Sequence, residues 1–277
     1  MGRVTAVYWP GHERLAVALA EQADRARRLP GILDSSRVPL ELVLAPSRAL
    51  FDSVTGGRAP DWGGGVALPG LRRIVLQVGR GGVHSGDLVR VLRHELAHLA
   101  LRERLRVRLP RWFEEGYAGT AAGEWHHAQV LQLNVSVARG RVWPLADVDR
   151  GLRGRQADAR QAYALAASAV QLLMRWGGPR GIDRLVSALE SGENFDSALR
   201  ASFGMTAEQF EVLWQRDLKR RYGWLGLAAA AGVLWAVLGL LAACLTLWRR
   251  RRDRVRRARL DAQERLPEVL DDQALQV

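Results

Sequence analysis

The chain has 277 residues, one cysteine and a formal net charge of +12. A single cysteine excludes an intrachain disulfide framework, and a chain of this length is ample for one hydrophobic core. The charge does not indicate nucleic-acid binding, because residues 216–259 contain twelve basic and two acidic side chains and surround an apolar segment.

The first third of the sequence predicts a small sheet with a few helices. Alternating or β-branched apolar runs indicate strands at 4–8, 40–44 and 74–78. Helical periodicity indicates an amphipathic helix at 11–28 and a short helix at 47–55. Residues 56–70 are rich in glycine and are expected to form a loop.

From residue 87 onward the pattern is helical. The expected helices are 87–106, 110–122, 124–137, 157–176, 182–191, 195–201 and 207–222. A small mixed sheet followed by a mostly helical C-terminal lobe predicts an α+β fold with a cleft between the two lobes.

The first of these helices carries a metal-site motif. His94-Glu95-Leu96-Ala97-His98 places two imidazoles four residues apart, on one helix face and one turn apart. Both can therefore reach one metal ion, and Glu95 can sit beside a water held by that metal. The alternative interpretation is a surface helix that happens to carry two histidines.

A catalytic zinc ion normally has three protein ligands and one open position. The candidate third ligand lies in residues 110–118, PRWFEEGYA, where a proline suited to the first turn begins a second helix. Either Glu114 or Glu115 fits this role, and spacing alone does not choose between them.

Together, HELAH and WFEEGYA resemble the motifs of the gluzincin branch of the MA-like metallopeptidases, which includes membrane alanyl aminopeptidases and the leukotriene hydrolase. The resemblance implies a thermolysin-like catalytic domain, a Zn²⁺ cofactor, and Glu115 as the third ligand beside His94 and His98. It also implies that Glu95 activates the zinc-bound water to hydrolyse a peptide or protein substrate. The gap between the two motifs is slightly shorter than in the aminopeptidases, which favours a compact, divergent member.

Two further site elements follow from the same resemblance. Tyr163, in AYALAASAV, matches a tyrosine whose hydroxyl stabilises the oxyanion, although the Lys-Gly that usually follows it is absent. Alternatively, Tyr163 simply packs at the end of an apolar helix. Resembling enzymes also pair the substrate with an edge strand beside the site, for which the strand at 74–78 is the candidate. No G-x-M-E-N-like run precedes the motif, which favours an endopeptidase.

Residues 223–248 contain no charged side chain, and as a helix they are long enough to span about 30 Å of hydrocarbon. Trp224 and Trp248 lie at the two ends, where aromatic rings favour the membrane interface. Eight arginines follow within 249–259 and only four basic residues precede within 216–221. This asymmetry predicts a cytoplasmic C-terminus, an extracytoplasmic catalytic domain, and contact of Arg249–Arg259 with anionic lipid head groups. The first residues lack an apolar signal segment, so a signal peptide is expected to be missing from this sequence, through a misplaced start codon or its removal. The alternative is a tail-anchored protein with the opposite topology.

The expected organisation is a peptidase domain at 1–222, a transmembrane helix at 223–248 and an Arg-rich cytoplasmic tail at 249–277. The expected function is a membrane-anchored zinc metallopeptidase. The alternative is a catalytically weak or inactive gluzincin-like module that binds peptides or an envelope partner. No nucleic-acid partner is expected, and the sequence indicates no oligomeric state. A basic patch is interpreted as solvated surface, and the alternative is a surface that steers acidic partners; its members are Arg102, Arg104, Arg106, Arg108 and Arg111.

Overall fold

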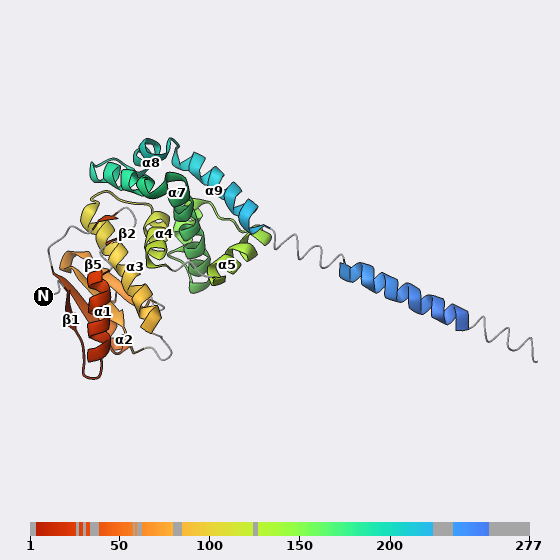
Figure 1. Cartoon of the computed structure of the whole chain (residues 1–277), viewed down its shortest axis with the longest axis horizontal. Coiled ribbons are helices and arrows are strands. Elements are labelled where there is room, and N and C mark those ends of the chain that lie inside the picture. The colour runs from red at the N-terminus through yellow and green to blue at the C-terminus, as the bar shows by residue number, and fades with distance from the viewer. Residues whose placement is uncertain are drawn as a thin grey trace, which may run out of the picture. The chain divides into compact units, whose positions relative to one another are not determined.

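The structure is a computed structural model that describes residues 4–25, 28–29, 32–33, 39–57, 59, 63–79, 85–123, 127–223 and 235–254. The chain divides into two compact units, Met1–Trp224 and Leu225–Val277, and each is described by itself. In the first unit the sheet and its covering helices lie at one end and the helices from α4 onward at the other (Figure 1).

The four-stranded sheet has the order β1-β4-β6-β5. Its strands are β1 (Val4–Val7), β4 (Leu40–Ala45), β6 (Arg73–Gln77) and β5 (Gly65–Leu68). The first three are parallel to one another, and β5 runs antiparallel to β6 at the edge. The strands predicted at 4–8, 40–44 and 74–78 are therefore confirmed within one residue at each end. A separate two-stranded hairpin, β2 (Arg28–Leu29) and β3 (Ile32–Leu33), has no counterpart in the prediction.

Alternation along β4 explains why helices cover both faces of the sheet. Leu42 and Leu44 pack on one face against α1 (Glu13–Arg25) and α3 (Ser85–Arg104). Val43 and Ala45 point to the other face, where they join Phe51 of α2 (Arg48–Thr55). These strand residues are almost completely buried, so the sheet is the centre of a three-layer N-terminal lobe.

The prediction of a loop at 56–70 was wrong in part. This stretch contains β5 and the start of a short 3-10 helix, η1 (Pro69–Leu71). Gly65, one of the glycines on which the loop prediction was based, instead allows β5 to lie close to α3. A Cβ at Gly65 would come within 2.6 Å of the Val91 side chain on α3, so only glycine lets the edge strand lie this close to the helix.

Seven helices follow β6 in the described part of the first unit. After α3 they are α4 (Arg111–Ala122), α5 (His127–Ala138), α6 (Leu145–Gly151), α7 (Gln156–Glu190), α8 (Phe195–Phe203) and α9 (Ala207–Tyr222). The short α6 was not predicted. The helices predicted at 157–176 and 182–191 form α7, in which Gly178 has non-helical angles (φ 59°, ψ −164°) and marks a kink.

Helix α4 is almost wholly buried and packs against α3 and α7. Trp112 stacks on Phe210 of α9 with ring centroids 5.7 Å apart, and Phe113 lies 5.1 Å from Phe195 of α8. Such aromatic pairs contribute beyond their buried area. The structure confirms the α+β fold with a small mixed sheet and a mostly helical C-terminal lobe.

In the second unit, residues 235–254 are helical and carry exposed apolar side chains such as Trp235 and Leu240. Among the residues that the structure describes, no helix is both long enough and apolar enough to cross a membrane. Residues 224–234 of the predicted span 223–248 lie outside the described residues, as does most of the predicted tail, from 255 onward.

Phe113→Ala is expected to lower the free energy of unfolding by about 3–5 kcal/mol, because it leaves a cavity in the packed centre of the helical lobe. Val212→Ala, at a position on α9 that is 47% exposed, is the control and should change it by about 0.5 kcal/mol or less. Urea unfolding followed by circular dichroism measures both variants. Equal losses for the two variants would contradict this assignment of the core.

Candidate metal centre

Helix α3 lies between the two lobes and buries side chains on both sides. Leu88, Leu92 and Leu99 pack toward the sheet, whereas Ala97 and Leu101 join the core of the helical lobe. The face between these two contacts carries His94 and His98, with side chains 13% and 21% exposed. The apolar pattern of the helix therefore sets its rotation, and this rotation turns both imidazoles toward α4.

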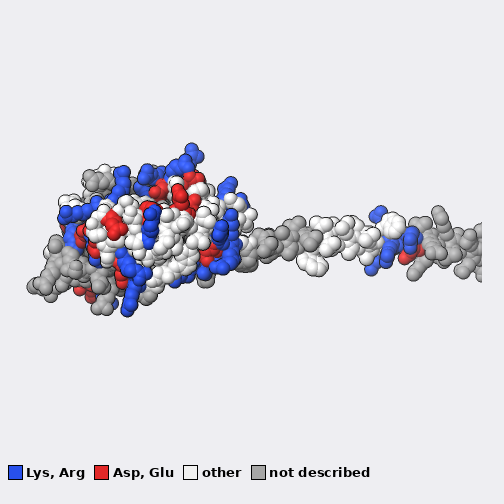
Figure 2. Space-filling view, turned by 90° about the horizontal axis from the view of Figure 1, so that it is seen from above, with Lys and Arg blue, Asp and Glu red and all other residues white. Residues whose placement is uncertain are grey.

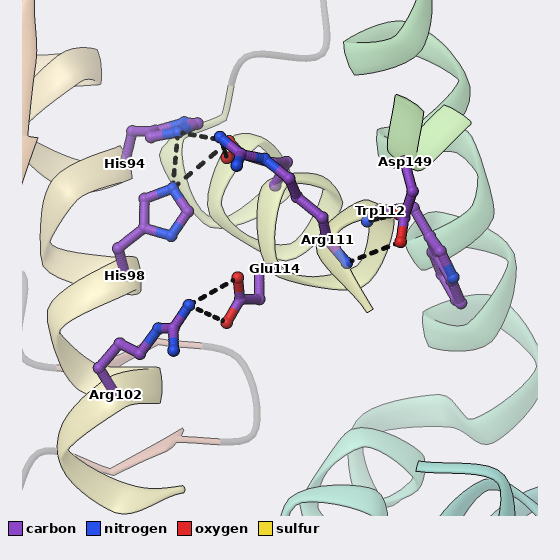
Figure 3. Close-up of polar contacts among 8 residues, drawn as sticks. His94, His98, Arg102, Arg111, Trp112, Glu114 and Asp149 are labelled. Atoms are coloured by element: carbon purple, nitrogen blue, oxygen red, sulfur yellow. Dashed lines mark hydrogen bonds and ion pairs between the residues drawn. The ribbon is translucent and has the colours of Figure 1, made fainter. Parts of the chain in front are cut away.

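Glu115 on α4 completes a compact group of three donors with His94 and His98, the two histidines labelled in Figure 3. The Nε2 atoms of His94 and His98 are 3.1 Å apart, and Glu115 Oε2 lies 3.5 Å and 3.4 Å from them. Ligand atoms of a tetrahedral zinc site, with bonds of about 2.0–2.2 Å, are about 3.3–3.6 Å from one another. The two distances to Glu115 fall in this range and the His94–His98 distance is slightly shorter, so the three donors have the chemistry and nearly the spacing to hold a metal ion of this kind.

The two adjacent glutamates have different partners, and of the two it is Glu115 that lies beside the histidines. Glu114 faces α3 further along the helix and pairs with Arg102, with Oε1 2.9 Å from Nη2 (Figure 3). Burial raises the pKa of Glu114, and the charge of Arg102 opposes this only in part. Burial also acts to raise the pKa of Glu115, but hydrogen bonds and charges from His94 and His98 outweigh it and hold that pKa well below its usual range. The two histidines therefore favour the ionised form of Glu115.

The start of α4 is fixed by a residue that the sequence did not single out. Asp149 on α6 accepts hydrogen bonds from the backbone N–H groups of Arg111 (3.3 Å) and Trp112 (2.6 Å). The first N–H groups of a helix have no partner within it, and Pro110 at the N-cap position has no side-chain acceptor. The lack of a capping side chain at Pro110 was the one signal in the sequence that an acceptor for these N–H groups had to come from elsewhere in the fold.

Three arginines of the basic patch pair with carboxylates while their side chains stay partly exposed. Arg102 pairs with Glu114, Arg104 pairs with Glu190 of α7, and Arg111 Nη2 lies 3.6 Å from Glu115 Oε1. These cations link α3 and α4 to neighbouring carboxylates. On the face shown in Figure 2, basic and acidic residues of the first unit are intermixed rather than gathered into one basic surface.

A cavity of about 650 Å³ opens beside the three donors. One wall is the edge strand β5 with the residues before it, Gly63–Ala67. Glu95 also lines the cavity, and its Oε2 accepts a 2.8 Å hydrogen bond from the backbone N–H of Ala67. The strand beside the site is therefore β5, whereas the expected candidate at 74–78, β6, lies inside the sheet between β4 and β5.

Tyr163 on α7 lines the same cavity, and its ring centroid lies 6.5 Å from that of His94. Burial raises the pKa of Tyr163 well above its usual range, and the charge of Glu115 raises it further. The phenol is therefore protonated at neutral pH and can donate a hydrogen bond. The structure thus brings all five predicted site residues (His94, Glu95, His98, Glu115 and Tyr163) to one cavity.

Comparison with known protein families agrees with this geometry. The family model of the Peptidase MA superfamily matches residues 36–220, which include the sheet from β4 onward and nearly all of the helical lobe. The chain belongs to the Peptidase MA superfamily. No curated protein matches the chain.

Zinc titration of the purified protein is expected to show one site per chain. Glu115→Gln should weaken zinc binding by more than about 100-fold, since it removes a direct ligand where even supporting residues change affinity by about 10–100-fold. Glu114→Gln is the matched control, because it removes the neighbouring carboxylate that pairs with Arg102 instead. Equal zinc affinity of the two variants would contradict the assignment of Glu115.

Proposed function

We propose that this protein is a zinc-dependent metallopeptidase, with His94, His98 and Glu115 as the metal ligands. The observation that carries the proposal is the convergence of these three donors beside Glu95 in one cavity, in a member of the Peptidase MA superfamily. When bound there, zinc would supply Lewis acidity toward a water molecule and toward the carbonyl of the scissile bond.

Glu95 is the general base in this proposal. Its side chain is about 9% exposed and faces the cavity, and the Ala67 N–H holds one of its carboxylate oxygens. The carboxylate accepts the proton of the attacking water and then delivers it to the leaving amine. Because a backbone N–H fixes its orientation, the carboxylate needs little rearrangement before the reaction.

The edge strand β5 provides the substrate-binding backbone. The carbonyl oxygen of Gly64 accepts a hydrogen bond from the backbone N–H of Gln77 on β6. In an antiparallel pair, backbone groups alternate between facing the partner strand and facing away, so the N–H and C=O groups of Gly65 point away from β6. An extended peptide can add to this edge, as in other cases of strand addition. In this arrangement the scissile bond passes in front of Glu95, which contacts the same strand at Ala67.

Tyr163 donates to the oxyanion that develops on the scissile carbonyl. Its protonated hydroxyl group faces the cavity beside the proposed metal ligands. A donor that is already oriented toward developing charge stabilises the transition state more than the bound substrate.

Glu95→Gln is expected to retain zinc and to lower kcat on a peptide library by about 10²–10⁴-fold, because the amide cannot accept the proton. Glu103→Gln, on the same helix and paired with Arg72, is the control and should keep full activity. Fluorogenic peptides, with and without a chelator, give the measurement. Stoichiometric zinc without any hydrolysis by the wild type would instead favour the peptide-binding module.

Tyr163→Phe is expected to lower kcat by about 10²–10³-fold with little change in KM, because it removes one oxyanion donor and keeps the ring. The same peptides and steady-state kinetics give the answer. An unchanged kcat would show that Tyr163 only packs against its neighbours.

We further propose that residues 223–248 anchor the enzyme in a membrane, with the catalytic domain outside the cytoplasm. The support is the absence of charge over 26 residues and the excess of arginine on the C-terminal side. Single cysteines introduced into the catalytic domain of Cys244→Ser protein should react with an impermeant reagent on intact cells. Cysteines in 260–277 should react only after permeabilisation. The reverse labelling pattern would overturn this topology.

A further inference from the structure

Two arginines line the cavity on the side of the helical lobe, together with the proposed metal ligands. Arg111 is the first residue of α4, and Arg153 lies in the turn that follows α6. Asp149 connects these two places, because it belongs to α6 and accepts the backbone N–H of Arg111. Leu152, which is 3% exposed, anchors the turn next to Arg153. The positions of the two cations are therefore set by one packed junction.

Arg111 has donor capacity that its neighbours do not use. The contact between its Nη2 and Glu115 Oε1, at 3.6 Å, is longer than a hydrogen bond. Its Nε is buried and has no hydrogen-bond partner in the described part of the protein. A buried donor of this kind is costly unless an acceptor reaches it. The side chain as a whole is 42% exposed and lines the cavity, so a ligand entering the cavity can reach the guanidinium.

Arg153 adds a second cation on the same wall. Its backbone N–H bonds to the carbonyl of Arg150, and that of Gly154 bonds to Gly151, which closes the turn. Within the described residues its side chain has no ion pair, and it is exposed. The two glutamates that line the cavity are already engaged, Glu95 by Ala67 N and Glu115 by the histidines. Among the described residues that line the cavity, the two arginines thus offer positive charge to a substrate.

We infer that Arg111 and Arg153 bind a carboxylate of the peptide substrate next to the scissile bond. This inference rests on the proposed function and names its substrate class. A guanidinium presents several N–H groups in a planar fork that matches a carboxylate. Because Arg111 lies beside Glu115, the bound carboxylate belongs to a residue adjacent to the cleaved bond. An acidic side chain and a free C-terminus both supply a carboxylate, and peptides that carry one or the other distinguish these two possibilities.

The test measures peptide binding to the full-length, zinc-loaded Glu95→Gln protein by calorimetry at about 0.15 M salt, where exposed charges are strongly screened. Three N-acetylated peptides of one neutral sequence are compared. The first ends in an amide, the second ends in an amide and contains one Glu, and the third ends in a free carboxylate. We expect the second or the third to bind at least about tenfold more tightly than the first, the typical effect of a charge-assisted pair. The peptide that gains affinity identifies the source of the carboxylate. Equal binding of all three would overturn the inference.

Variants added to the same protein separate recognition from a structural role. Arg111→Gln and Arg153→Gln should each remove most of the carboxylate advantage and leave the neutral peptide and the zinc content unchanged. Arg150→Gln, three residues from Arg153 and paired with Asp147, is the control and should retain the advantage. If Arg111 only supports Glu115, then Arg111→Gln weakens zinc and all three peptides alike while Arg153→Gln has no effect, which would overturn the inference.

Hydrolysis of the same peptides by the wild type keeps the two proposals distinguishable. A carboxylate preference in binding without any hydrolysis would contradict the proposed peptidase and leave the recognition site standing. Hydrolysis with no carboxylate preference in either assay would contradict only the role of the two arginines.

Discussion

The close packing of α4 against α7 is the constraint on which the site depends. A Cβ at Gly116 would lie 2.3 Å from the backbone carbonyl oxygen of Ala166, so only glycine permits this approach. Glu115 immediately precedes this contact, and therefore the packing of two helices decides where its carboxylate points. In WFEEGYA, Glu115 thus supplies a candidate metal ligand and Gly116 allows the close packing of the two helices.

Further contacts hold α4 in the same position. Asp149 bonds to its first two N–H groups, and the aromatic side chains of Trp112 and Phe113 insert among Phe195 and Phe210. On the other side, α3 is fixed by its apolar contacts with both lobes. The His-His-Glu group is therefore preorganised by the core, and a metal ion bound there would meet donors that are already close to their required spacing.

Local sequence patterns predicted those parts of the site that depend on a single helix. The spacing of His94 and His98 follows from helix geometry alone, so the motif predicted their common face. The choice between Glu114 and Glu115 depends on the rotation of α4, which is set by Gly116 and the core, and only the family resemblance pointed to Glu115. Strand β5 was missed because its four residues lie within the glycine-rich stretch 56–70, and it owes its conformation to pairing with β6. The capping by Asp149 and the place of Arg111 at the cavity arise only through tertiary packing, which no local pattern reveals.

Zinc K-edge X-ray absorption of the purified, zinc-loaded protein tests the central claim most directly. The account predicts one zinc ion per chain, with scattering from two imidazole rings and with oxygen or nitrogen ligands at about 2.0–2.2 Å. One imidazole contribution should disappear in His98→Ala. A spectrum without imidazole scattering, or one that is the same in wild type and His98→Ala, would contradict the account.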